Sequence, residues 1–326
     1  MKKLVVIPFL VMTFLIQLEA KTPIEARKLR EVKYELIRPK AQEYHEKMMV
    51  AYQASDWNKV VLEAKLLKMN YPQSPLLADA YFLMGVAYYK QSEYEHANQA
   101  FTDYLKDSQN LRNFEEAVQY KYEIAKLFES GVKKRLFGLK KMPKILPAKE
   151  EAINVYNEVI AAMPRSDLAC DSLFRKANLL VYFEEFSEAI DTYQVLIRRF
   201  PKSSFSPRSY VSIAQIYLKQ CQQEFPDPSL IELAEINLKK FESSYPTEPL
   251  IEEVKLKLAT MRGVFAEELY VTGNYFVKKK KYDSAYIYYK TILSKYSDTK
   301  YYGLTLEKIE QLKKKTGKSL DFEHPL

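Results

Sequence analysis

Apolar residues recur along most of the chain at spacings of three and four, the period of an α-helix that buries one face. Between them the chain is rich in lysine and glutamate, and only seven of its 326 residues are glycine. Tight β-turns are therefore scarce. The pattern predicts an all-α fold made of many helices joined by short turns.

The helical pattern repeats along the chain. One segment carries small and aromatic residues in a fixed order: Tyr81, Met84, Gly85, Tyr88, Tyr94, Ala97 and Phe101. This spacing matches the tetratricopeptide repeat, in which small residues let two antiparallel helices approach and aromatic residues fill the space around them. The signature recurs around Ala177, Ala189 and Tyr193, and around Gly273, Ala285 and Tyr289. With weaker copies elsewhere, it predicts a superhelical solenoid of about five to six helix-turn-helix units.

Prolines and glycines indicate where the helices end. In four copies the second helix is expected to stop before a proline, at these positions: Tyr71, Met163, Phe200 and Tyr245. Two glycines and two prolines mark residues 131–147 as a loop inserted between the paired helices of the third repeat. Residues 249–277 are predicted to form one long helix shared by the fifth and sixth repeats.

The first residues have the features of a signal peptide. Lys2 and Lys3 precede an apolar run, and Ala20 is a small residue suited to cleavage. An uncleaved anchor stays open, because Leu18 is large for its place before the cut. The nearest cysteine is Cys170, so no lipid anchor is expected. The predicted organisation is: signal peptide 1–20; N-terminal extension 21–40; N-terminal repeats 41–164; C-terminal repeats 165–300; capping helix and disordered tail 301–326.

Charge and cysteine usage narrow the possible partners. The formal net charge is +8. For an exported protein the available anions are lipid head groups or acidic faces of proteins, so no nucleic-acid partner is expected. Cys170 and Cys221 fall roughly 20 Å apart along the repeat, at 1.5 Å per helical residue. Because a disulfide needs Cα atoms within about 7 Å, both are expected to be separate buried residues.

The sequence offers no recognisable catalytic machinery. Its histidines are His45, His96 and His324, and none has another histidine or a cysteine at ligand spacing. No glycines stand in a phosphate-binding arrangement. Paired carboxylates such as Glu115 and Glu116 are typical of a solvated helix surface. We therefore expect a protein that is not an enzyme, with no catalytic, cofactor-binding or metal-binding residues.

Aromatic and basic residues are the candidates for binding. Most of the 26 tyrosines occupy positions where the repeat needs a core aromatic. Others could anchor an extended peptide on the inward-facing first helices; for this groove the candidates are Tyr44, Tyr81 and Tyr88.

The inserted loop is strongly basic. Its cations are Lys133, Lys134, Arg135, Lys140, Lys141 and Lys144. They could contact a membrane surface or an acidic partner, or they could simply be solvated.

The last repeat resembles that of the BamD family, whose members assist assembly of outer-membrane β-barrel proteins. The resemblance rests on Glu268-x-x-Val271, the aromatic pair Tyr275-Phe276, Tyr282-x-x-Ala285, and Tyr296-Ser-Asp-Thr299. It extends more loosely from about Tyr44 to Thr299 and includes the long shared helix. Three departures are the missing lipid-bearing cysteine, a turn one residue longer between Val271 and Tyr282, and Ser297 in place of proline.

The resemblance implies a non-catalytic periplasmic subunit at the inner face of the outer membrane. Its C-terminal repeats would dock on the barrel-forming subunit; the implied residues are Glu268, Tyr275, Lys278 and Lys279. Its N-terminal repeats would receive unfolded β-barrel proteins, and attachment would come through a protein partner. A periplasmic adaptor of the Tol-Pal or cell-division coordinator type is the alternative, although residues 26–50 lack the sustained heptads of a coiled coil. An enzyme or an enzyme accessory, such as a superhelical cell-wall hydrolase lacking its catalytic domain, is the third possibility.

Overall fold

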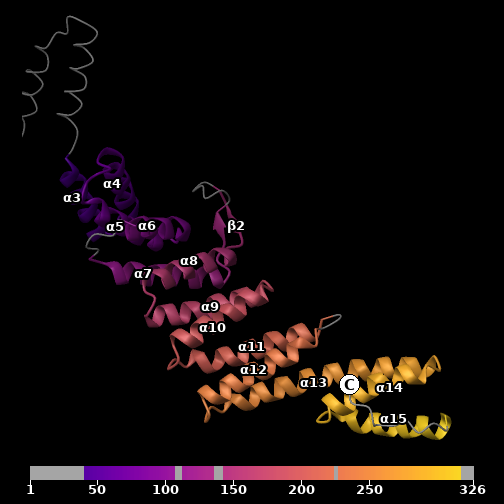
Figure 1. Cartoon of the computed structure of the whole chain (residues 1–326). Coiled ribbons are helices and arrows are strands. Elements are labelled where there is room, and N and C mark those ends of the chain that lie inside the picture. The colour runs from indigo at the N-terminus through magenta and orange to yellow at the C-terminus, as the bar shows by residue number, and fades with distance from the viewer. Residues whose placement is uncertain (1–39, 107–111, 136–141, 224–226, 317–326) are drawn as a thin grey trace, which may run out of the picture. The chain divides into compact units, whose positions relative to one another are not determined.

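A computed structural model describes residues 40–106, 112–135, 142–223 and 227–316, and it is almost wholly helical (Figure 1). The predicted signal peptide, most of the N-terminal extension and the tail after residue 316 lie outside the described residues. In chain order the helices are α3 (Ala41–Gln53), α4 (Trp57–Asn70), α5 (Leu77–Lys90), α6 (Tyr94–Lys106), α7 (Phe114–Glu129), α8 (Lys149–Ala162), α9 (Asp167–Tyr182), α10 (Phe186–Arg199), α11 (Phe205–Cys221), α12 (Ser229–Ser244), α13 (Leu250–Lys278), α14 (Tyr282–Lys295) and α15 (Lys300–Thr316).

Consecutive helices pair as antiparallel hairpins: α3 with α4, α5 with α6, α9 with α10, α11 with α12, and α13 with α14. The second helix of a pair also packs on the first helix of the next, as α4 does on α5 and α10 on α11. Within each unit, hairpins thus bury their apolar faces against their neighbours along the chain. This arrangement confirms the predicted all-α tetratricopeptide solenoid.

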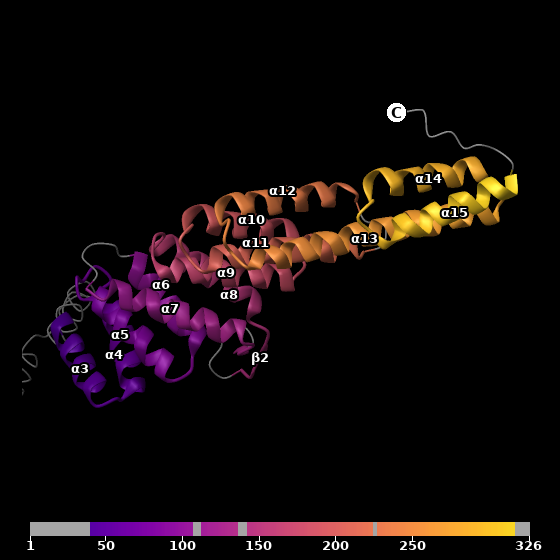
Figure 2. The same cartoon turned by 90° about the horizontal axis from the view of Figure 1, so that it is seen from below.

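The chain forms two compact units. Among the described residues, one comprises those up to Lys121 together with those of Lys134–Leu146, and the other comprises Tyr122–Lys133 and those from Pro147 onward. The division predicted after residue 164 falls inside the second unit. In that unit the hairpins from α9 onward stack in order, and α13 runs past α11 and α12 before continuing beside α14 and α15 (Figure 2).

Small residues set the distance between paired helices. A Cβ added to Gly85 would lie 2.7 Å from the ring of Phe101, and one added to Gly273 would lie 2.5 Å from the ring of Tyr289. The predicted role of Gly85 in close helix contact is confirmed, and the same contact recurs in the last hairpin. The turns repeat as well: the residue two positions before the second helix has a positive φ in four hairpins, at Ser55, Ser92, Glu184 and Lys280.

Helix ends follow the prolines as predicted. The residues that cap the C-termini of α4, α8, α10 and α12 are Tyr71, Met163, Phe200 and Tyr245. Each precedes a proline, which cannot continue a helix because its ring clashes with the preceding turn. The predicted long helix is confirmed as α13. Cys170 and Cys221 are buried and not joined to each other.

The insertion between α7 and α8 contains a short antiparallel ribbon, β1 (Lys134–Arg135) paired with β2 (Lys144–Leu146). The sequence predicted only a loop here, because strands this short leave no alternation to recognise. The ribbon belongs to the first compact unit.

Candidate functional site

The four predicted docking residues lie on α13 and the turn that follows it. Glu268, Tyr275, Lys278 and Lys279 are spaced so that they share one face of the helix. All four are exposed, and the Tyr275 side chain is 55% accessible. The Lys279 Nζ lies 5.6 Å from the centroid of the Tyr275 ring. The structure therefore brings the predicted residues together, and their role in docking stays a prediction.

The opposite face of α13 is fixed against α14. Gly273 contacts Tyr289, whose hydroxyl donates a hydrogen bond to Asn274 Oδ1 at 2.9 Å. The ring of Phe276 stacks on Tyr288 with a centroid distance of 5.5 Å. These contacts set the rotation of α13, so Tyr275 is held outward while Phe276 is held inward.

Four consecutive lysines, residues 278–281, follow this exposed face. Within the part of the chain that the structure describes, none of them forms an ion pair with a carboxylate. Lys278 lies in the last turn of α13, where the helix dipole favours a positive charge. The result is an aromatic and cationic surface that suits a partner with exposed carboxylates.

The prediction for Tyr44 and Tyr88 is wrong, because both side chains are buried, at 7% and 5% exposure. The Tyr44 hydroxyl accepts a hydrogen bond from Asn70 Nδ2 at 3.0 Å, and the Tyr88 ring lies 5.1 Å from the ring of His96. Their place on the first helices serves packing within the hairpin, so neither ring can anchor a peptide. Tyr81 is half-buried beneath Lys68 Nζ, and its role stays a prediction.

The basic insertion is partly used inside the molecule. Arg135 donates two hydrogen bonds to the buried carboxylate of Glu93, at 2.6 and 2.9 Å. Lys144 Nζ donates to the carbonyl oxygen of Ser92 at 2.6 Å. Arg135 holds the pKa of Glu93 below its usual value, against the opposite effect of burial. Two of the six cations thus attach the ribbon to the turn between α5 and α6, while Lys140 and Lys141 lie outside the described residues.

Replacing Glu93 with glutamine is expected to loosen the ribbon. The amide removes the charge and one acceptor oxygen from a paired, buried group. We expect trypsin to cleave the native variant after Arg135 and Lys144 about five to ten times faster than the wild type. The reason is that the detached ribbon is populated more often in the variant, and trypsin cleaves that open form. The control is Glu46→Gln, an exposed carboxylate of α3. Equal cleavage rates in the two variants would contradict this attachment.

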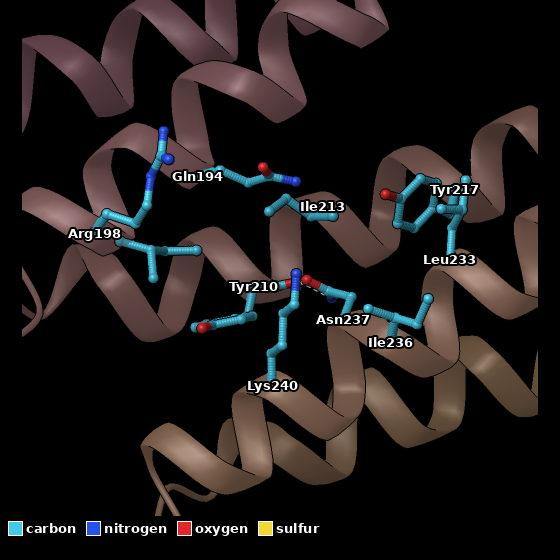
Figure 3. A pocket seen from close by; sticks show the side chains of 10 residues that line it. Gln194, Arg198, Tyr210, Ile213, Tyr217, Leu233, Ile236, Asn237 and Lys240 are labelled. Carbon is cyan, nitrogen blue, oxygen red and sulfur yellow. Dashed lines mark hydrogen bonds between the residues drawn. The ribbon is translucent and has the colours of Figure 1, made fainter.

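A groove that the sequence did not indicate lies in the second unit, between α10 and α12 with α11 at its base (Figure 3). One cavity of the groove has a volume of about 280 Å³, and a larger hollow of about 730 Å³ continues it along α12. Apolar side chains form the base, and Lys240 reaches from α12 into the middle of the lining (Figure 3). The lining cations are Arg198, Lys239 and Lys240, and the lining contains no carboxylate.

Polar clusters elsewhere are paired internally. Arg175 bonds both Asp171 and Glu129, at 2.7 and 3.1 Å, and Tyr156 donates to Glu129 at 2.5 Å. Such mutual pairing is typical of a structural network. Among the described residues no group of histidine, cysteine and carboxylate side chains is arranged to hold a metal ion.

Comparison with known families agrees with this architecture. Residues 212–321, which include α13 and α14, match the YfiO family of outer membrane lipoproteins. Residues 79–110 and 171–203 match a tetratricopeptide-repeat family. No curated protein matches the chain. In the described part of the chain, no helix combines the length and apolar character needed to cross a membrane.

Several solved helical-repeat structures are similar to the chain. A tetratricopeptide-repeat protein from Parabacteroides merdae is 15% identical, covers 78% of this chain and 92% of its own, and has a TM-score of 0.34. YrrB, described as a tetratricopeptide-repeat protein with an unusual peptide-binding site, is 12% identical, covers 69% and 96%, and has a TM-score of 0.34.

Proposed function

We propose that the chain is a non-catalytic subunit of the machinery that assembles outer-membrane β-barrel proteins. The proposal rests on its being a tetratricopeptide-repeat protein similar to the BamD-type outer membrane lipoproteins. In this role it works in the periplasm at the inner face of the outer membrane. It binds the barrel-forming subunit through its last repeats and unfolded barrel proteins through its first repeats.

The exposed face of α13 carries the proposal. It lies within the residues that match the outer membrane lipoprotein family, and it presents Glu268, Tyr275, Lys278 and Lys279 together. A solvent-exposed tyrosine beside unpaired lysines has the composition of an interface anchor with charged surroundings. The packing of α13 on α14 holds this face in place before any partner binds, which reduces the entropy lost on binding.

Attachment to the membrane would come through the partner. The charged start and apolar run of the first residues support export. The same docking face would therefore decide both the location of the protein and its activity.

The test is affinity capture of the tagged full-length protein from solubilised envelopes, with wild type compared with Lys278→Glu/Lys279→Glu. Reversing two exposed charges at an interface of this kind should reduce recovery of the barrel-forming subunit by about tenfold or more. Lys202→Glu/Lys295→Glu is the matched control, because it makes the same charge change at two exposed lysines of the same unit that lie outside the docking face.

Equal recovery of the barrel-forming subunit by wild type and by the Lys278→Glu/Lys279→Glu variant would exclude this docking face. Recovery of Tol-Pal or cell-wall proteins, without any outer-membrane barrel protein, would instead support a periplasmic adaptor in envelope biogenesis.

A further inference from the structure

Two of the three carboxylates of α12 pair with cations of α13. Glu235 pairs with Arg262 at 3.0 Å, and Glu242 pairs with Lys255 at 3.3 Å, so both carboxylates are directed toward α13. Lys239 and Lys240 line the groove. Glu235 and Glu242, the carboxylates within one helical turn of Lys239, are thus occupied elsewhere, and the third, Glu232, lies about two turns before Lys239.

The groove keeps three exposed cations. Arg198 from α10 and Lys239 and Lys240 from α12 line it, and in the described ranges none of the three forms an ion pair. A concave surface lined by one sign of charge concentrates the opposite sign near it. The groove therefore attracts anionic groups.

The lining of the groove also contains large apolar side chains that are exposed to solvent. Leu233 and Ile236 of α12 are 43% and 50% exposed, and they lie one helical turn apart beside Ile197 and Ile213. Exposed apolar residues grouped in a hollow and bordered by polar ones mark a binding surface rather than ordinary scatter.

The walls of the groove are rigid. Asn237 is buried and donates a hydrogen bond from Nδ2 to the carbonyl oxygen of Tyr210 at 3.0 Å, which joins α12 to α11. The Tyr210 ring stacks on Phe241 at 4.7 Å, and the Tyr245 hydroxyl donates to the carbonyl oxygen of Pro201 at 2.5 Å. A ligand would meet a preformed site and would not have to order these helices.

We propose that this groove binds a short acidic segment of a partner protein that carries one or two large apolar side chains. The apolar side chains enter the cavity over Ile213, and carboxylates on either side of them pair with Arg198, Lys239 and Lys240. The two hollows of about 280 and 730 Å³ share part of their lining and follow α12, which suits an extended segment. This surface is separate from the docking face of α13, so the two can bind different partners.

The test measures fluorescence anisotropy of a labelled synthetic peptide in which glutamates alternate with leucine and phenylalanine, using the full chain. Two further peptides replace either the glutamates with lysines or the apolar residues with serines. We expect the acidic apolar peptide to bind, the lysine peptide not to bind, and the serine peptide to bind at least about tenfold more weakly. Raising the salt to about 0.5 M should weaken binding several-fold, because screening acts on exposed charges.

Two variants locate the site. Lys239→Glu/Lys240→Glu and Leu233→Ser/Ile236→Ser each change exposed side chains, so unchanged circular dichroism is expected, together with at least about tenfold weaker binding of the acidic apolar peptide. Lys278→Glu/Lys279→Glu should leave peptide binding unchanged, which keeps this result independent of partner capture through α13.

Three outcomes would overturn the proposal. These are binding that is equal for the acidic and lysine peptides, binding that neither groove variant weakens, and no binding of the acidic peptide when vesicles containing phosphatidylglycerol do bind. The last result would assign the basic groove to a lipid surface.

Discussion

Replacing Gly273 with alanine is expected to lower the free energy of unfolding of the last hairpin by about 3 kcal/mol, the upper range for forcing an extra methyl group into a packed contact. The added Cβ would lie 2.5 Å from the Tyr289 ring. That ring is fully buried, and its hydroxyl is bonded to Asn274, so it cannot move aside without losing contacts. The helices would separate, and the docking face of α13 would lose its support.

The matched control is Gly263→Ala in the same helix, where the added Cβ meets no atom within 4 Å. There alanine should be neutral or stabilising by up to about 1 kcal/mol, because it is the better helix former. Urea unfolding followed by circular dichroism measures both. Similar stability of the two variants would mean that the contact between α13 and α14 yields easily, and that the small-residue position is not what sets the spacing.

The repeat could be predicted from sequence because its determinants are local. The small residue at Gly85 and the aromatic at Phe101 belong to one hairpin, and the prolines after α4, α8, α10 and α12 act on the helix just before them. The docking residues are also local, since their spacing places Glu268 and Tyr275 on one face whatever surrounds the helix.

The remaining features depend on contacts between hairpins. Tyr44 looked like a surface anchor because its helix position suits one, but Asn70 and Tyr71 of the next helix cover it. The groove could not be found from Lys239 and Lys240 alone. Its charge depends on Arg262 and Lys255 pairing with two carboxylates of α12, and that pairing is set only when α13 packs beside it.

Burial of tyrosines is expected to make the folded protein less stable at alkaline pH. Burial, together with the neighbouring carboxylate of Asp171, raises the pKa of Tyr122 to about 12. Burial alone raises the pKa of Tyr193 to about 12. Burial also raises the pKa values of Tyr156 and Tyr289. In the unfolded chain a tyrosine ionises near pH 10. The stability that these neutral hydroxyls contribute is therefore complete below about pH 10 and is lost as the pH rises toward the folded values.

We expect cooperative unfolding of the second unit between about pH 10 and 12, where the unfolded chain releases protons that the folded chain retains. Loss of helical circular dichroism should coincide with a step in tyrosinate absorbance. Gradual ionisation with the helices intact would show instead that the buried hydroxyls reach water without unfolding.

Two variants separate this mechanism from general instability at high pH. Tyr193→Phe removes one buried ionisable group and its hydrogen bond to Asn178 at 2.5 Å. It should cost about 1 kcal/mol at neutral pH, from the lost hydrogen bond, yet reduce the slope of stability against pH above about pH 10, because one proton fewer is released on unfolding. Tyr275→Phe, at an exposed position of α13, should change neither quantity. If the two variants gave the same slope, the alkaline unfolding would have to arise from groups other than the buried tyrosines.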